Sequence, residues 1–409
     1  MKTADAVVIG AGVSGSSIAF RLAQQGLKVV IVDKNGPGSG ASGACDQAIF
    51  MQSKRPGLHM ELALASRRMY DTLEAELEHS VEFESDGGMV VIETPRHMEF
   101  MKDFIEKQRK AGISVSLIDG DAAREAQPFL APHILGASFS PDDAGVNPLA
   151  LNAAFFRAAK RQGAVHQTHS EVIAVHTERG KVTSVDTTRG SISTRLVINA
   201  AGPFSKKVGA LSNIDVPVQP RRGTILISES VPKKVTGCIL DAQYIASKHL
   251  RSDNDDAPPY GVGFSLGQTV SGNLLIGGSR EFAGFDKRPN QDVIATIAGH
   301  AARIAPELAS TRIIRTMTGF RPCTGDGLPI IDRAAEVDGY IIAAGHEGDG
   351  LALAPLTGQL VVDLLKGSGP THHFLSGLRV DRFAQSQEAE TVGTSGVALT
   401  VEPQLPAPA

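Results

Sequence analysis

The stretch that decides the fold is ADAVVIGAGVSGSSIAFRLAQQGLKVVIVDK, residues 4–34. An apolar run at 6–9, typical of a buried parallel strand, leads directly into the glycine pattern G-x-G-x-x-G at 10–15. Helical periodicity follows as far as Gly26, where a glycine that ends a helix is expected, and a second apolar run closes the stretch. This order of strand, turn, helix and strand predicts a dinucleotide-binding unit of the Rossmann type.

Each part of this turn has a mechanical role in such a unit. Gly10 permits the sharp turn, Gly12 lets the backbone approach a pyrophosphate, and Gly15 lets the helix pack close to the strand. The helix begins near Val13 and Ser14, and its first N–H groups and positive dipole end favour phosphate. A glycine pattern alone is weak evidence, because glycine turns also serve packing, but the strand–helix–strand context favours the nucleotide site.

Asp33 and Lys34 follow the second apolar run, which we expect to be a strand at 27–32. The Asp33 carboxylate can accept hydrogen bonds from an adenosine ribose and would repel a 2′-phosphate. The fingerprint does not separate NAD from FAD. A standard NAD domain would continue with another regular βα unit, whereas here the glycine-rich run NGPGSGASGACDQAIF, residues 35–50, follows. This run indicates a backbone that passes beside a bulky ligand.

Composition narrows the class of protein. The chain has 409 residues, which exceeds the size at which a single core stops growing, and 42% are hydrophobic, as in ordinary globular proteins. A net charge of −4 gives no electrostatic case for nucleic acid or anionic membrane. Three distant cysteines without a C-x-x-C pair disfavour a disulfide framework or a cysteine-bound metal. Because there is no leader and no apolar run of membrane length, we expect a cytoplasmic protein.

Later periodicities extend the α/β pattern and interrupt it with β-rich insertions. Helices are expected at 53–77, 97–111, 148–162, 290–305 and from near Gly350 to Lys366. Strands are expected at 89–93, at 195–199, at 310–320, at 340–344 and in a hairpin that turns at Gly180 and Lys181. From Gln219 long alternating runs predict an antiparallel sheet, and residues 385–409 have the composition of a loose tail.

Five segments, in this order, give the chain a resemblance to a known family: VVIGAGVSGSSIAFRLAQQGLKVVIVDK, GSGASGA, NAAGPFS, TGFRPCTGDGLPII and AAGHEGDGLALAPLTG. Over residues 5–375 the sequence resembles the D-amino-acid oxidase-like family of FAD-dependent amine oxidoreductases. The segments SKRPG, LDAQYIASK, SGNLLIGGSREFAGFD and GHEGDG are most similar to the flavin β subunits of heteromeric opine and hydroxyproline dehydrogenases.

The resemblance implies an α/β plus antiparallel β fold with the flavin ring at the junction of two domains. It implies a discontinuous Rossmann-type FAD domain at 1–85, 145–218 and 318–375. It implies a substrate domain built on an antiparallel sheet at 86–144 and 219–317, and a C-terminal extension at 376–409. The two β-rich insertions seen in the periodicity agree with this division.

Arg321 lies in the segment TGFRPCTGDG, and the residues alone allow either a surface salt bridge or a ligand role. The resemblance implies that its guanidinium projects over the flavin and clamps a substrate carboxylate, while the adjacent proline stiffens the loop. The family often uses a tyrosine to cover the substrate, which makes Tyr260 a second candidate catalytic residue. Tyr244 and Arg280 are candidate substrate-binding residues, each with a structural alternative.

The resemblance also implies a set of residues around FAD, with no metal. The last glycine loop would aim a helix end at the flavin. His346, Glu347 and Asp349 in this loop could be catalytic, but a loop or capping role is the favoured interpretation for each. Cys45 either attaches FAD covalently or is a small buried residue. The expected cofactor-binding residues are Gly10, Gly12, Val13, Ser14, Gly15, Asp33, Lys34, Ser42, Gly43, Ala44, Cys45, Gln47, Val172, Ala200, Ala201, Gly202, Arg321, Gly345, His346, Gly348, Asp349, Gly350 and Leu351.

Three functions stay open at this point. The favoured one is oxidation of the C–N bond of an amino acid or N-substituted amino acid to an imine, within a hetero-oligomer whose partner subunits carry further redox cofactors. Peripheral association with an electron acceptor at the membrane would be compatible with it. The alternatives are a stand-alone oxidase that forms hydrogen peroxide and a flavin electron-transfer subunit without substrate chemistry. Lys54 and Arg55 would reach the flavin or a partner, or be ordinary exposed charges.

Overall fold

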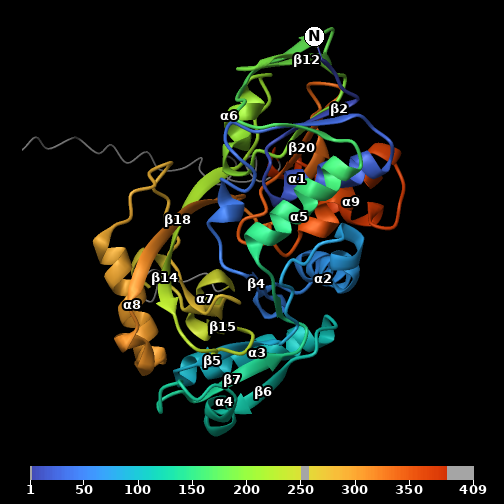
Figure 1. Ribbon diagram of the computed structural model, residues 1–409. Coiled ribbons are helices and arrows are strands. Elements are labelled where there is room, and N and C mark those ends of the chain that lie inside the picture. Colours follow the sequence, from blue (N-terminus) through green and yellow to red (C-terminus); the bar gives the residue numbers. More distant parts are fainter. Residues whose placement is uncertain (1, 250–257, 385–409) are drawn as a thin grey trace, which may run out of the picture.

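The computed structural model describes residues 2–249 and 258–384 (Figure 1). The loose tail expected at 385–409 lies outside the described residues. The chain forms a six-stranded sheet, an eight-stranded sheet, a four-stranded sheet and a two-stranded ribbon. Mixed α/β and antiparallel β architecture is therefore confirmed. The expected boundaries of the two domains stay a prediction.

The six-stranded sheet contains the opening stretch of the sequence. Its order is β19-β20-β13-β2-β3-β9, and five neighbouring strands run parallel while β19 is antiparallel to β20. Every residue of the two N-terminal strands is buried, as their continuous apolar runs predict. The strands are β2 (Ala6–Ile9), β3 (Val29–Val32), β9 (Val165–Gln167), β13 (Val197–Asn199), β19 (Ile330–Arg333) and β20 (Tyr340–Ala344).

Alternate residues of β2 enter two different cores. Ala6 and Val8 belong to the core beneath the helices, whereas Val7 and Ile9 belong to the core beneath the four-stranded sheet. Helices α1 (Val13–Gln24), α5 (Pro148–Arg161) and α9 (Ala354–Lys366) lie side by side over the first face, and α2 (Leu58–Leu77) packs on α9 (Figure 1). The other face is covered by β1 (Lys2–Thr3), β12 (Gly190–Ser193), β11 (Lys181–Thr187) and β10 (Val172–Glu178).

The eight-stranded sheet joins segments that lie far apart in the sequence. Its order is β18-β14-β17-β16-β15-β5-β7-β6, and helix α8 (Gln291–Ile304) packs against β14 and β17. All neighbours are antiparallel except β5 and β15, which run parallel. The strands are β5 (Gly88–Ile92), β6 (Ser116–Asp119), β7 (Gly136–Ser140), β14 (Gln219–Ser230), β15 (Cys238–Asp241), β16 (Ser265–Gln268), β17 (Asn273–Gly277) and β18 (Ile313–Cys323).

Short elements complete the fold. The ribbon of β4 (Ala48–Ile49) and β8 (Ala144–Gly145) links the glycine-rich run to the strands that follow. The remaining α-helices are α3 (Pro95–Lys110), α4 (Gly120–Ala126), α6 (Ser205–Ala210) and α7 (Ala242–His249). The 3-10 helices are η1 (Ala41–Gly43), η2 (Met51–Ser53), η3 (Gly202–Phe204), η4 (Pro259–Gly261), η5 (Pro306–Ser310) and η6 (His372–Leu378).

Several expected boundaries are wrong, and two of the differences follow from a glycine with positive φ. The second strand begins at Val29 instead of 27, since Gly26 still turns the chain with φ +81°. The helix expected from residue 53 begins at Leu58, because Gly57 has φ +98° and cannot extend it backwards. The strand expected to end at 320 continues to Cys323. The last helix begins at Ala354 instead of near Gly350, after separate turns.

Candidate active site

The first glycine turn is fixed by two contacts that exclude a side chain. Gly10 has φ +110°, and a Cβ there would lie 2.4 Å from the backbone oxygen of Ala200. A Cβ at Gly15 would lie 2.0 Å from the oxygen of Gly10, so the helix can approach the strand only with glycine at this position. The roles expected for these two glycines are confirmed. The contact also brings the segment at 200–202, which follows β13, against the turn.

The amino end of α1 suits a phosphate group. The helix begins at Val13, immediately after Gly12, and its first turn carries no acidic side chain. The Val13 N–H donates to Ser42 Oγ at 3.0 Å, and the Asn152 amide donates to the oxygen of Ala11 at 3.3 Å. A glycine cap and a positive dipole end without a competing carboxylate therefore leave a cradle for a pyrophosphate.

Asp33 holds the glycine turn, while contact with a ribose stays a prediction. Its Oδ2 accepts a hydrogen bond from the Ala11 N–H at 2.8 Å, and its Oδ1 accepts one from the Asn35 N–H at 2.7 Å. Its backbone oxygen accepts from the Ser170 N–H, which places the start of β10 at Val172 nearby. Asp33 and Val172, two of the expected cofactor-binding residues, therefore lie near each other at the end of β3.

The glycine-rich run connects this turn to the strand of Arg321. The Gly38 N–H donates to the oxygen of Ala11 at 3.0 Å, and a Cβ at Gly43 would lie 2.2 Å from the oxygen of Gly38. Farther along, a Cβ at Gly319 in β18 would lie 2.7 Å from the Cβ of Ala44. The run therefore lies between the nucleotide turn and the eight-stranded sheet, and its contact with a ligand stays a prediction.

Two other expected cofactor residues have structural partners. The Gln47 side chain donates to the oxygen of Gln268 in β16 at 3.2 Å and so ties the run to the eight-stranded sheet. The Lys34 ammonium lies 3.8 Å from the ring centroid of Phe204. A cofactor role for these side chains stays a prediction.

Arg321 lies inside a strand, so the expectation of a loop arginine is wrong. It belongs to β18 and is the register partner of Arg221 in β14. Its Nη1 donates to the oxygen of Ser279 at 3.1 Å, and a Cβ at Gly223 would lie 2.1 Å from the same atom. A Cβ at Gly348 would lie 3.8 Å from its Nε. The arginine therefore meets the last glycine loop although it lies in the other sheet.

The last glycine loop winds through residues 345–353 before α9. Gly345 has φ +80°, and a Cβ there would lie 2.5 Å from Thr324, while Glu347 has φ +50°. Glu347 forms an ion pair with Arg221 at 3.1 Å between Nη1 and Oε1. The N–H of Asp349 donates to the oxygen of His346, and turns of this kind replace the helix start expected near Gly350.

His346 is buried and neutral. Its Nε2 lies 2.9 Å from Thr357 Oγ1, and that hydroxyl donates its only proton to the oxygen of Leu353. The imidazole must therefore donate from Nε2. Burial lowers the pKa of His346 to about 4, although the nearby charge of Asp349 opposes this shift. This geometry supports a structural role in which His346 ties the last glycine loop to Thr357 of α9, and no side chain among the described residues caps that helix.

Asp349 is part of a buried charged group that sequence reasoning missed. Its Oδ1 lies 2.6 Å from the ammonium of Lys54, and its Oδ2 lies 2.7 Å from Nε2 of His59. Lys54 is only 2% exposed, so its expectation as an ordinary exposed charge is wrong. The signal was present in the sequence as a lysine between the glycine-rich run and α2, but nothing local revealed its partner.

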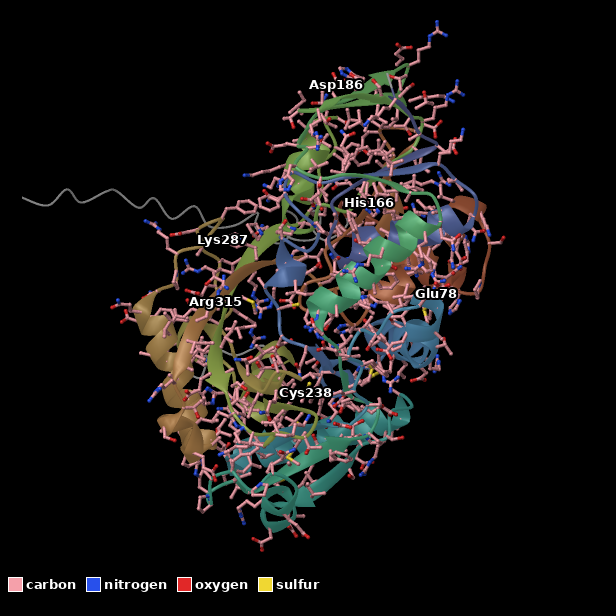
Figure 2. All side chains as sticks on the ribbon, in the orientation of Figure 1. Glu78, His166, Asp186, Cys238, Lys287 and Arg315 are labelled. Atoms are coloured by element: carbon pink, nitrogen blue, oxygen red, sulfur yellow. The ribbon has the colours of Figure 1, made fainter. Side chains whose placement is uncertain are left out.

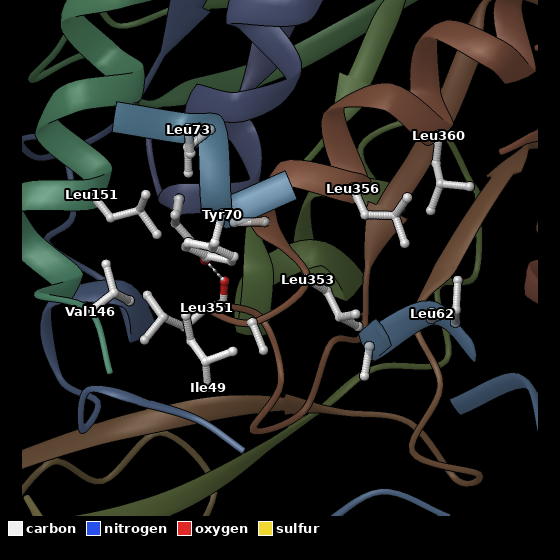
Figure 3. Packing of buried hydrophobic residues seen from close by; sticks show 14 of the residues in the cluster. Ile49, Leu62, Tyr70, Leu73, Val146, Leu151, Leu351, Leu353, Leu356 and Leu360 are labelled. Atoms are coloured by element: carbon white, nitrogen blue, oxygen red, sulfur yellow. Dashed lines mark hydrogen bonds between the residues drawn. The ribbon is translucent and has the colours of Figure 1, made fainter. Parts of the chain in front are cut away.

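The same loop is fixed from the helix side by Tyr70 in α2. The Tyr70 hydroxyl donates to the oxygen of Leu351 at 2.6 Å, and the dashed line in Figure 3 marks this bond within the surrounding leucines. Tyr70 is 1% exposed, and burial raises its pKa. The loop is thus held both by a charged contact and by a core residue.

Tyr244, Tyr260 and Arg280 come together in the structure. The guanidinium carbon of Arg280 lies 4.2 Å from the ring centroid of Tyr244, and the Arg280 N–H donates to the oxygen of Tyr260 at 3.0 Å. Tyr260 is 40% exposed and has φ +57°. Arg280 directly follows Ser279, whose oxygen accepts a hydrogen bond from Arg321, while contact of the three residues with a substrate stays a prediction.

All three cysteines are free thiols. Burial, followed by the charge of Asp46, raises the pKa of Cys45 to about 12. Burial also raises the pKa of Cys238, which lies in the eight-stranded sheet (Figure 2), and that of Cys323. These thiols are protonated at neutral pH, which supports packing roles for them.

A cluster of acidic and histidine side chains next to the eight-stranded sheet consists of residue types that can bind a metal. Glu93, Asp241 and His300 offer atoms that lie within 4.8 Å of one another. Within the described part of the chain, Asp241 Oδ2 and His300 Nε2 lie 3.0 Å apart, while Glu93 already pairs with His133 and Arg303. These ion pairs link α8 to β15 and to Glu93, the residue after β5, and the expectation of no metal stays untested.

The strand, glycine turn and helix define a dinucleotide-binding fold, and sequence comparison identifies the family. Residues 5–364 match the DAO family, described as FAD dependent oxidoreductase. The chain belongs to this family, and it is an FAD-dependent oxidoreductase. The cradle at 10–15 and the open helix end of α1 are features of this chain that fit the cofactor.

Three similar proteins illustrate the range of the family. Glycine oxidase of Geobacillus kaustophilus is 30% identical over 379 residues, covering 88% of this chain and 93% of that protein. An opine oxidase subunit of Agrobacterium tumefaciens is 26% identical, covering 86% of this chain and 91% of that protein. The crystal structure of L-proline dehydrogenase from P. horikoshii has a TM-score of 0.84 at 26% identity, covering 94% and 99%. In the segments that the structure describes, no helix has the length and apolar character needed to cross a bilayer.

Proposed function

We propose that this protein oxidises the C–N bond of an amino acid or an N-substituted amino acid to an imine. The observation that carries the proposal is the position of Arg321, whose guanidinium lies against Gly348 of the last glycine loop. Glycine and L-proline, named in two of the similar proteins, both carry nitrogen on the carbon next to a carboxylate. A planar guanidinium is the group that binds a carboxylate with two parallel hydrogen bonds.

The roles of the chain's residues follow from that contact. Arg321 holds the carboxylate, which fixes the adjacent carbon and its C–H bond relative to the cofactor layer. The nitrogen lone pair forms the C=N bond as the hydride leaves, and water then hydrolyses the imine to an oxo acid and an amine. FAD, when bound, accepts the hydride. His346 and Asp349 are engaged by Thr357 and Lys54, so neither is assigned as a base.

We further infer that the protein works as the flavin subunit of a hetero-oligomeric dehydrogenase. Support comes from the similarity to a protein named as one subunit of an opine oxidase, a name that implies at least one other subunit. The chain's three cysteines lie in separate elements and offer no iron–sulfur ligand set. Electrons would therefore leave through cofactors on a partner.

The test is anaerobic reduction of the purified flavoprotein by a panel of proline, hydroxyproline, sarcosine, glycine, D-amino acids and opines. We expect at least one compound to bleach the flavin, and an artificial dye to be reduced much faster than hydrogen peroxide forms in air. Rapid stoichiometric peroxide from the single chain would instead establish a stand-alone oxidase, the function that the glycine oxidase similarity favours. No bleaching by any compound would leave the electron-transfer subunit.

A further inference from the structure

We propose that Arg280 binds a second carboxylate of the substrate, so that the preferred substrate class is an N-(carboxyalkyl) amino acid. Such a compound carries one secondary amine between two carboxylates. The inference rests on the proposed function, in which Arg321 holds the first carboxylate. It adds a residue and a substrate class to that site.

The position of Arg280 supports this assignment. It directly follows Ser279, whose backbone oxygen accepts the hydrogen bond from Arg321 Nη1 at 3.1 Å. A Cβ at Gly261 would lie 2.7 Å from the backbone oxygen of Arg280, so the turn of η4 presses closely on this residue. The Arg321 guanidinium is therefore bonded to the residue that precedes Arg280, and the backbone of Arg280 is held in place by η4.

The guanidinium of Arg280 is held only by neutral groups among the residues described. It lies over the ring of Tyr244, its Nη2 donates to Ser247 Oγ at 2.7 Å, and its Nε donates to the oxygen of Gly261 at 3.5 Å. These contacts orient the planar group without neutralising it. A group oriented in this way loses little freedom when it binds a carboxylate.

Charge is unbalanced around the two arginines. Of the three arginines in this region, Arg221 pairs with Glu347, whereas neither Arg280 nor Arg321 forms an ion pair within residues 2–249 and 258–384. Burial lowers the pKa of Arg280, and the positive charges of Arg221 and Arg321 lower it further, while Tyr244 and the charge of Glu347 act in the opposite direction. The positive charge of Arg321 lowers the pKa of Asp46, but the stronger effect of burial raises it, and Asp46 forms no ion pair with Arg321.

Two partly buried cations that form no ion pair with any residue the structure describes favour a ligand that brings two negative charges. A single carboxylate on Arg321 would leave the partly desolvated charge of Arg280 without an ion-pair partner, which is costly. A second carboxylate on the same molecule would give Arg280 that partner and add a charge-assisted hydrogen bond. Charge and position together thus define the substrate class.

The experiment compares iminodiacetate with N-ethylglycine, which replaces one carboxylate by a methyl group. Each is oxidised by loss of a hydride and hydrolysed by water, and the dye takes the two electrons. We expect wild type to favour iminodiacetate in kcat/KM by about 10- to 100-fold. Arg280→Gln should bring this ratio towards one, while Arg280→Lys keeps part of it. Arg315→Gln, an exposed arginine on the same strand as Arg321 (Figure 2), should keep all of it.

The outcomes separate the two levels of the proposal. A wild-type ratio near one, or an equal ratio in the glutamine and lysine variants, overturns the second carboxylate site. So does a high ratio that survives Arg280→Gln in a protein with normal FAD content. Failure of both compounds and of the whole amino-acid panel to bleach the flavin overturns the proposed function itself, on which this inference rests.

Discussion

The nucleotide turn at 10–15 and the arginine site around Arg321 are built in opposite ways. The turn is backbone packed on backbone, and added Cβ atoms at its first and third glycines would meet carbonyl oxygens at 2.4 and 2.0 Å. The arginine site consists of side chains from β14, β18 and the segment after β17, which meet only when the eight-stranded sheet forms. The first region therefore fails when atoms are added, and the second when charged atoms are removed.

The largest effect is expected in the backbone region. Gly12→Val should yield a folded protein without FAD, because the valine side chain would take the space of the pyrophosphate. A Cβ added at this position would also lie 3.2 Å from Ser42 Oγ. The flavin-to-protein absorbance ratio and the circular dichroism spectrum measure this. Gly299→Val, at an exposed position in α8 with nothing within 4 Å, is the matched control. A Gly12→Val protein with full FAD would contradict the assignment.

Removal of the Lys54 charge tests the contact between Lys54, which follows η2, and Asp349 of the last glycine loop. Lys54→Met should lower the free energy of unfolding by about 3–5 kcal/mol, because it leaves the buried Asp349 carboxylate with His59 as its remaining partner in this ion-pair group. Denaturant unfolding of the flavoprotein measures the change. Lys107→Met breaks an exposed pair with Asp103 and should have almost no effect. Equal losses in both variants would show that burial of Lys54 does not matter.

Truncation of Arg321 tests the side-chain region directly. Arg321→Ala should keep FAD and lose about 2–5 kcal/mol of transition-state stabilisation for carboxylate substrates, measured as kcat/KM. Arg321→Lys should recover little, because an ammonium cannot make two parallel hydrogen bonds. Arg315→Ala on the same strand is the control. A kcat/KM for Arg321→Ala within a few-fold of wild type would exclude the clamp.

The smallest predicted effect depends on pH. The folded pKa of His346 is lowered to about 4 from 6.5, so its contribution to stability is complete above pH 6.5 and is lost as the pH falls towards 4. The loss reaches about 3 kcal/mol at most. His346→Gln, whose amide can still donate to Thr357, should flatten this part of the stability curve. The exposed His372→Gln should leave the curve unchanged.

The same contrast explains how much the sequence could reveal. Gly10, Gly15 and Asp33 obey short-range steric and hydrogen-bonding rules, so their spacing predicts their structure. Arg321 was singled out by the segment around it, but its place in a strand was missed. Pro322 argues against a strand in the sequence, because proline cannot donate a hydrogen bond within a sheet. The structure accommodates it because β18 is an edge strand.

Other residues carried no local signal at all. Lys54 and Asp349 lie almost 300 positions apart, and no periodicity predicts that the two would pair at 2.6 Å. Arg221 and Arg280 have the same difficulty, because only strand pairing brings them towards Arg321. The parallel pairing of β5 with β15 could not be predicted either, because the sequence of each segment is equally compatible with an antiparallel strand.

The strand order of the six-stranded sheet has a consequence for how the chain folds. Strand β2, near the start of the chain, is paired with β13, and β13 is paired with β20 at residues 340–344. Helix α9, which lies against α1, ends only at Lys366. During synthesis the N-terminal unit must therefore wait for most of the chain before its layer can close. Such long sequence separations slow folding and leave strand edges exposed in the meantime, so folding of this layer depends on protection of those edges from aggregation.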